Sequence, residues 1–160
     1  MPKVVSNTTP LLSFIKLNRL DILKELYGEV IIPEAVLNEI ERGKDRFYVE
    51  ISGKHWIKVL KIKNRRILER FKNRLDIGEA EALALAIETK ANLLLIDEKI
   101  GRKVAKEFNI KFTGTIGILL KAKEQGIIDE VKPYIIELTE KGNYYKESFI
   151  RTVLKHAGEI

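Results

Sequence analysis

The sequence predicts an α/β protein, a three-layer α/β/α arrangement with a mainly parallel central sheet and a helical C-terminal extension. Short apolar segments alternate with helical segments, and the connections between them are short. This alternation is typical of strand–helix–strand units, which build parallel sheets covered by helices on both faces. Residues 93–96 are uniformly apolar, as expected for a central strand buried on both faces.

Each element follows from local sequence features. The strands are predicted at residues 3–7, 29–32, 57–62, 93–97 and 110–112. The third is expected at a sheet edge, because it alternates apolar and basic residues. The helices are predicted at residues 8–17, 19–27, 33–42, 65–74, 80–90, 99–108, 115–124, 130–139 and 145–155. Gly28 and Gly43 end two of these helices, and Asp76 with Glu79 resembles a capping box at the start of another.

Residues 1–142 are predicted to form one domain, with residues 143–160 as a helical extension packed on it. The extension places apolar side chains at helical spacing, at Phe149, Ile150, Val153, Leu154 and Ala157. Packing on the body is the preferred interpretation. The alternative is a helix that binds a partner protein or a second protomer.

Composition excludes several classes of site. The 160-residue chain is 45% hydrophobic, enough for a packed core, and it has no cysteine, so disulfides and thiolate chemistry are excluded. His55 and His156 are the only histidines, which argues against a histidine-rich zinc site. There is no leader-like N-terminus and no run of 18 apolar residues, so we expect a soluble cytoplasmic protein without a membrane segment.

The net charge of +6 is unevenly distributed. Residues 54–74 contain nine basic residues and one acid, which leaves the rest of the chain at −2. Such a basic stripe is a candidate footprint for a phosphate backbone, and the alternative is a solvated helix face. The residues predicted to contact nucleic acid are Lys61, Lys63, Arg65, Arg66 and Arg70.

Polar side chains follow the predicted strands, at the sheet edge where α/β proteins bind ligands. The candidates are Asn7, Glu39, Glu79, Asp97 and Thr115. Each has an ordinary alternative. Asp97 and Thr115 would be helix caps, Glu79 part of a capping box, Glu39 a solvated helix residue and Asn7 a turn residue.

Carboxylates gathered at one sheet edge repel one another unless a cation neutralises them. Oxygen ligands without histidine or cysteine favour Mg²⁺ or Mn²⁺. Such ions polarise phosphoryl oxygens and activate water. Together with a basic stripe, this chemistry indicates phosphodiester hydrolysis.

Four segments together resemble the PIN-domain family of ribonucleases and toxin–antitoxin toxins. They are VVSNTTPL at 4–11, IPEAVLNE at 32–39, DIGEAEALALA at 76–86 and LLLID at 93–97. TGTIG at 113–117 also resembles a mostly uncharacterised PIN-like subfamily. The resemblance spans about residues 3 to 140, and it rests on the order and spacing of the segments.

The resemblance implies cleavage of single-stranded RNA with one or two Mg²⁺ or Mn²⁺ ions. Glu39, Glu79 and Asp97 match the family's later acidic ligands, with Glu79 standing where Asp is usual. Thr115 resembles a Ser or Thr near the metals. Asn7 departs from the family, because the first ligand is normally Asp and a neutral amide should weaken metal binding. The resemblance also implies an antitoxin partner and a homodimer.

Three functional hypotheses follow. The first is a metal-dependent ribonuclease, a toxin component, with Asn7, Glu39, Glu79 and Asp97 as catalytic metal ligands. The second is a non-catalytic nucleic-acid-binding or regulatory protein, because of Asn7. The third is a phosphoacceptor signalling domain, which would need an acidic pair after the first strand, where this chain has Ser6 and Asn7.

Overall fold

The computed structural model describes residues 2–43, 51 and 53–160. Residues 1, 44–50 and 52 of the predicted first domain lie outside this part. The described strands are β1 (Val4–Ser6), β2 (Val30–Pro33), β3 (Ile57–Leu60), β4 (Leu93–Leu95) and β5 (Phe112–Thr113). They form one sheet in the order β3-β2-β1-β4-β5, with every neighbouring pair parallel. The predicted parallel sheet is confirmed, and β3 is an edge strand as expected.

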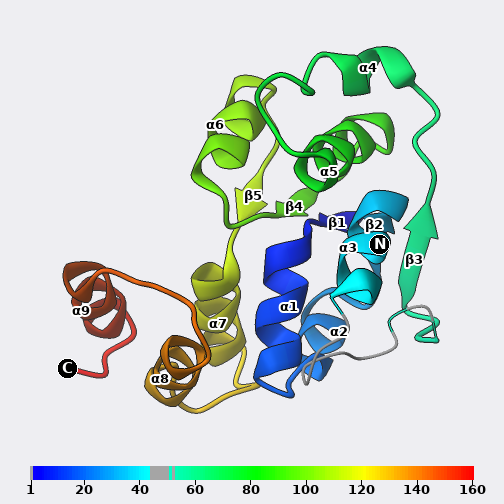
Figure 1. Cartoon of the computed structure of the whole chain (residues 1–160). Coiled ribbons are helices and arrows are strands. Elements are labelled where there is room, and N and C mark those ends of the chain that lie inside the picture. Colours follow the sequence, from blue (N-terminus) through cyan, green and yellow to red (C-terminus); the bar gives the residue numbers. More distant parts are fainter. Residues whose placement is uncertain (1, 44–50, 52) are drawn as a thin grey trace.

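The helices that connect and follow the strands complete the layers. They are α1 (Thr8–Lys16), α2 (Asp21–Tyr27), α3 (Glu34–Arg42), α4 (Arg65–Glu69), α5 (Ile77–Glu88), α6 (Lys99–Glu107), α7 (Thr115–Glu124), α8 (Lys132–Glu140) and α9 (Glu147–His156). In Figure 1, α4, α5 and α6 lie on one side of the sheet, and α1, α2, α3 and α7 lie on the other. The three-layer prediction is therefore confirmed.

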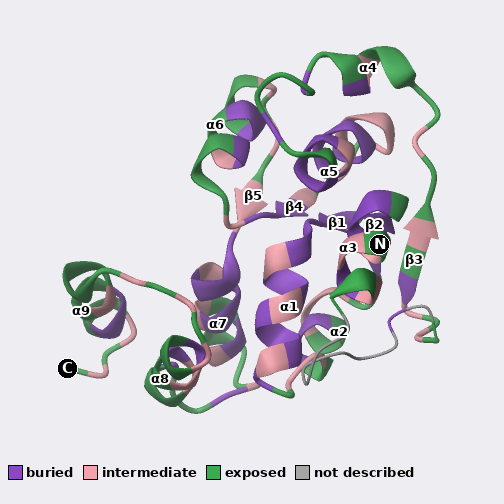
Figure 2. Cartoon of the chain, viewed as in Figure 1, coloured by how far each residue is buried: buried purple, intermediate pink, exposed green. Residues whose placement is uncertain are grey.

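Strand residues alternate between the two faces and so build two cores. Val4 and Leu95 belong to the cluster that includes α1, α2 and α7. Val5 and Leu94, one residue away in each strand, belong to the cluster under α5 and α6. Successive strand side chains point to opposite faces, so a fully apolar strand such as β4 supplies both cores. Figure 2 shows the buried residues concentrated on either side of the sheet.

Several predicted boundaries differ from the structure: the helix predicted at 80–90 spans 77–88, and the strand predicted at 57–62 ends at Leu60. Two further differences have identifiable reasons. The helix predicted at 65–74 ends at Glu69, because the chain tightens into turns that bring Phe71 against Phe108, with ring centroids 5.2 Å apart. The last strand begins at Phe112 rather than at residue 110. Ile110 instead donates its amide to the carbonyl of Ala105 and closes a Schellman motif, with Asn109 at φ 56°.

The C-terminal residues pack on the body. Val153 and Leu154 of α9 are buried in the same cluster as Leu11 and Phe14 of α1. Phe149, predicted to face the body with them, is instead 46% exposed. No helix in the described part of the chain is long and apolar enough to cross a membrane.

Candidate metal and nuclease site

The sheet topology brings the candidate residues to one edge. Asn7 follows β1, Asp97 follows β4 after one residue, and Thr115 follows β5. The amide of Asn7 donates to the carbonyl of Leu95 over 2.9 Å, which ties the ends of β1 and β4 together. Because all five strands are parallel, these ends share the carboxyl edge of the sheet.

Asn7 lies at the centre of this edge and is 3% exposed. It occupies the N-cap position of α1 with extended backbone, yet its side chain accepts no capping hydrogen bond. The turn alternative, in which the side chain bonds its own backbone, is therefore not what the structure shows. Asn7 is therefore a buried residue whose side chain does not cap α1.

Glu39 reaches the edge from α3 and is held there by two neighbours. Its Oε2 accepts a hydrogen bond from the Thr8 hydroxyl over 2.8 Å. Its other oxygen lies against the backbone of Gly78, so closely that a β-carbon at Gly78 would collide with it. Glu39 is half-buried rather than freely solvated.

Glu79 is buried in the first turn of α5. It forms the predicted capping box with Asp76, whose Oδ1 accepts from the Glu79 amide over 2.8 Å. Burial raises the pKa of Glu79 to about 7, and the charges of Asp76 and Glu98 add to this rise. Glu79 can be both part of the capping box and a candidate metal ligand, because its carboxylate lies close to the acids Asp76 and Glu98.

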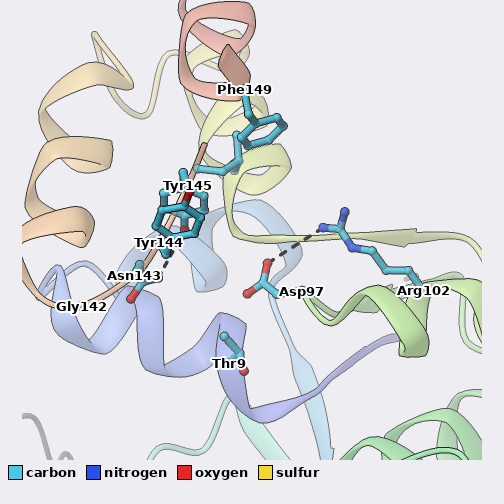
Figure 3. A pocket seen from close by; sticks show the side chains of 9 residues that line it. Thr9, Asp97, Arg102, Gly142, Asn143, Tyr144, Tyr145 and Phe149 are labelled. Atoms are coloured by element: carbon cyan, nitrogen blue, oxygen red, sulfur yellow. Dashed lines mark hydrogen bonds and ion pairs between the residues drawn. The ribbon is translucent and has the colours of Figure 1, made fainter. Parts of the chain in front are cut away.

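Both carboxylate oxygens of Asp97 accept hydrogen bonds from Thr115. Oδ1 accepts from the Thr115 amide and Oδ2 from the Thr115 hydroxyl, each over 2.7 Å. Asp97 therefore does not cap α6, which follows it, and Thr115 is the first residue of α7 rather than its cap. Arg102 lies 4.0 Å from Asp97 Oδ1, as the dashed line in Figure 3 marks. A β-carbon at Gly114 would come within 2.5 Å of the same oxygen.

These residues fit a hard divalent cation by their chemistry, since every candidate ligand is an oxygen. Burial is the main cause of the raised pKa of Glu79, the neighbouring acids add to it, and a bound cation would oppose the rise. In the described residues, however, no three His, Cys, Asp or Glu side chains group closely enough to hold one ion. Glu39 and Asp97 are instead each engaged by a threonine hydroxyl.

The predicted nucleic-acid contacts lie away from these acids along α5. Lys61, Lys63, Arg65, Arg66 and Arg70 are all exposed. The backbone amides of Lys63 and Asn64 donate to Glu88 Oε1 over 2.8 and 2.6 Å. Glu88 ends α5, whereas Glu79 lies in its first turn, about 13 Å apart at 1.5 Å per residue. The structure does not bring the basic stripe onto the acidic edge, and its contact with RNA stays a prediction.

Three residues of this edge were missed by the sequence analysis. Thr8 positions Glu39, Arg102 lies beside Asp97, and Glu98 accepts from the Thr9 hydroxyl over 3.2 Å. The adjacent acids Asp97 and Glu98, directly after the apolar strand, were visible in the sequence. The partners of Thr8 and Arg102 depend on tertiary contacts and were not.

The family comparison agrees with this geometry. A sequence model of the family DUF3368, a PIN domain, matches residues 3–159. The chain belongs to the PIN-domain family. The match covers nearly the whole chain, including α9. No curated protein matches the sequence. PIN domains have a nuclease-type fold, generally use divalent metal ions and act on RNA.

Proposed function

We propose that this PIN domain is a metal-dependent ribonuclease that hydrolyses phosphodiester bonds of single-stranded RNA. The observation that supports it most is the group of oxygen donors at the carboxyl edge of the sheet. Asn7, Glu39, Glu79 and Asp97 all reach this edge from different elements. Glu79 in particular is buried among acids, and burial of this kind is unfavourable without a compensating cation.

The ion is proposed to be Mg²⁺ or Mn²⁺, with Asn7, Glu39, Glu79 and Asp97 as its ligands. For one ion to engage three of these carboxylates, they would have to move closer together than they lie in the described part of the chain. When bound, such an ion polarises a phosphoryl oxygen and lowers the pKa of water. The chain's own residues orient the ligands. Thr8 fixes one oxygen of Glu39, and Thr115 fixes both oxygens of Asp97. The exposed basic stripe would hold a more distant part of the RNA backbone.

The biological setting is proposed from the family. We propose a cytoplasmic toxin component that is neutralised by an antitoxin protein and that acts as a homodimer.

The second candidate function is a non-catalytic RNA-binding or regulatory protein, and Asn7 favours it. Carboxylate charge is the main attraction that oxygen sites offer to Mg²⁺, and Asn7 removes one charge from the most buried of the four candidate ligands. In this alternative, RNA binding survives EDTA and weakens steeply as salt rises.

One experiment separates the two functions. Mn²⁺ binding is measured by calorimetry, and cleavage of a single-stranded RNA is followed with and without EDTA. The proteins compared are the wild type, Asp97→Ala, Asn7→Asp and the control Asp129→Ala, which removes an exposed carboxylate outside the site. If the protein is a ribonuclease, the wild type and the control bind Mn²⁺ and cleave the RNA. EDTA and Asp97→Ala abolish cleavage. Asn7→Asp binds Mn²⁺ about tenfold more tightly, since an added ligand charge is worth on the order of 1.4 kcal/mol.

Other outcomes point elsewhere. If only Asn7→Asp binds Mn²⁺ and cleaves the RNA, the wild type is a disabled nuclease. That result favours the second candidate function, a non-catalytic RNA-binding or regulatory protein. If neither protein binds Mn²⁺, the carboxylates are structural and the ribonuclease proposal fails.

A further inference from the structure

A pocket beside Asp97 combines aromatic and charged side chains. It has a volume of about 450 Å³, within the usual range for small-molecule sites. The lining includes Asp97, Arg102, Asn143, Tyr144, Tyr145 and Phe149. Figure 3 shows Asp97 and Arg102 on one side, with the tyrosines and Phe149 reaching the pocket from the C-terminal segment. The pocket therefore borders Asp97, one of the four candidate metal ligands.

Tyr144, Tyr145 and Phe149 form the aromatic wall of this pocket, and two of the three rings are exposed. Tyr144 is 82% exposed and Phe149 is 46% exposed, in a chain that buries most of its large apolar side chains. The rings of Tyr145 and Phe149 lie 6.3 Å apart and are inclined by 31°. Exposed ring faces beside a cation are the arrangement on which unpaired nucleobases stack, because every base offers a π-face.

The wall is rigidly mounted although it belongs to the C-terminal extension. Asn143 Oδ1 accepts from Lys16 Nζ over 2.9 Å, and its amide nitrogen donates to Ser13 Oγ over 3.2 Å and to the Tyr145 hydroxyl over 3.3 Å. These bonds tie the segment before α9 to α1, whose N-cap residue is Asn7. The backbone that carries the three rings and the side chain of Tyr145 are therefore anchored to the body, which reduces the ordering cost of binding.

Arg102 provides a positive group at the opposite side of the pocket. Its Nε donates to the carbonyl of Ile96 over 3.0 Å, which fixes the start of the guanidinium group. Its side chain remains 40% exposed. A guanidinium group with exposed donors binds phosphate oxygens well. The pocket thus combines aromatic faces, the amide of Asn143 and the guanidinium group of Arg102. These groups suit the base and phosphate of a nucleotide better than they suit an aliphatic peptide side chain.

We propose that this pocket binds one unpaired nucleobase of the RNA, stacked on Tyr144 and Phe149, with Arg102 contacting the adjacent phosphate beside Asp97. The inference rests on the proposed function and deepens it. It explains a preference for single-stranded RNA, because a base must leave its helix to enter the pocket.

The test measures binding of a fluorescein-labelled single-stranded RNA octamer by anisotropy, in EDTA, so that no cleavage occurs. Tyr144→Ala is expected to weaken binding about 5- to 100-fold, in line with the usual value of base–aromatic stacking. Tyr144→Phe should bind as the wild type does, because the ring is kept. Phe149→Ala should also weaken binding, and the control Ile136→Ala, which removes an exposed apolar side chain of α8 outside this pocket, should not.

An octamer with abasic residues, which keeps the phosphates, distinguishes stacking from charge. The proposal expects the alanine variants and the wild type to bind this probe equally. It is overturned if Tyr144→Ala and Phe149→Ala bind the normal octamer like the wild type, which would leave the wall to a protein partner. It is also overturned if they lose both probes equally. Because binding is measured without metal, a failure of hydrolysis and a failure of stacking are separate results.

Discussion

Two glutamates from opposite parts of the molecule, Glu79 and Glu159, show what distinguishes the candidate site from the scaffold. Glu159 near the C-terminus accepts from the amides of Val131 and Lys132, over 2.7 and 2.9 Å, and from Lys123 Nζ over 2.9 Å. Burial alone would raise the pKa of Glu159, but these donors lower it below its usual value. Burial raises the pKa of Glu79 to about 7.

The difference lies in the partners rather than in the residue type. Glu159 meets a lysine and two amides, so its charge is compensated within the fold. The charges that act on Glu79 are the carboxylates of Asp76 and Glu98. Glu159 is given a cation and two short amide bonds, whereas Glu79 accepts from the Asp76 amide over 3.4 Å and has no cation among the groups that shift its pKa. An added cation would therefore favour the charged form of Glu79.

The largest expected effect is on the rate of RNA cleavage, and it comes from displacing the candidate ligand Glu39 without removing it. Gly78→Ala would place a methyl group where Glu39 Oε1 now lies. The flexible carboxylate should give way, and a displacement of about 1 Å at a catalytic group costs on the order of 100-fold in rate. Stability should change by less than about 1 kcal/mol, because alanine favours the helix over glycine. RNA cleavage rates and thermal unfolding together check this expectation.

Gly117→Ala is the matched control for this variant. Gly117 lies within α7, and an added methyl group there would meet the Thr113 hydroxyl rather than a candidate ligand. Cleavage by this control should equal that of the wild type. Wild-type cleavage by Gly78→Ala would mean that the position of Glu39 does not matter to the reaction.

The second largest expected effect is that Glu79→Gln changes how protein stability depends on pH, measured in EDTA so that no metal is bound. Because the pKa of Glu79 is raised from 4.5 to about 7, its contribution is fully present below pH 4.5 and is lost as pH rises through 7. Glu79→Gln keeps an acceptor for the capping box and removes the charge. It should therefore stabilise the protein at pH 8 by about 1–3 kcal/mol and change little at pH 4.

Chemical denaturation at several pH values measures this effect. Glu34→Gln, which changes an exposed acid in the first turn of α3, is the control and should show no such alkaline gain. If Glu79→Gln gains nothing at pH 8, the charge of Glu79 is already compensated and the contrast with Glu159 fails.

Much of the fold could be predicted from the sequence because local and tertiary preferences agree. The uniformly apolar β4 and the capping box at Asp76 leave little choice of structure. The boundary at Phe112 could not be predicted, since it depends on how α6 closes around Asn109. At the site, the identities of Glu39, Glu79 and Asp97 were visible as acids after strands or at helix starts. The bond from Thr8 to Glu39, and the aromatic wall beside Asp97, join residues far apart in sequence and needed the structure.

The smallest expected effect is at Glu159, and it has the opposite sign with pH. Its pKa is lowered, so its contribution to stability is present above pH 4.5 and is lost as pH falls below that value. Glu159→Gln keeps one acceptor oxygen for the amide of Val131, but its NH₂ group would face the amide of Lys132. The variant also loses the ion pair with Lys123, whose side chain is partly exposed. The expected loss at pH 7 is about 1 kcal/mol, and it should shrink near pH 3, where Glu159 itself is neutral. The exposed neighbour Glu130→Gln is the control. Denaturation curves in which Glu159→Gln and Glu79→Gln shift stability in the same direction with pH would show that the two carboxylates do not differ as their partners indicate.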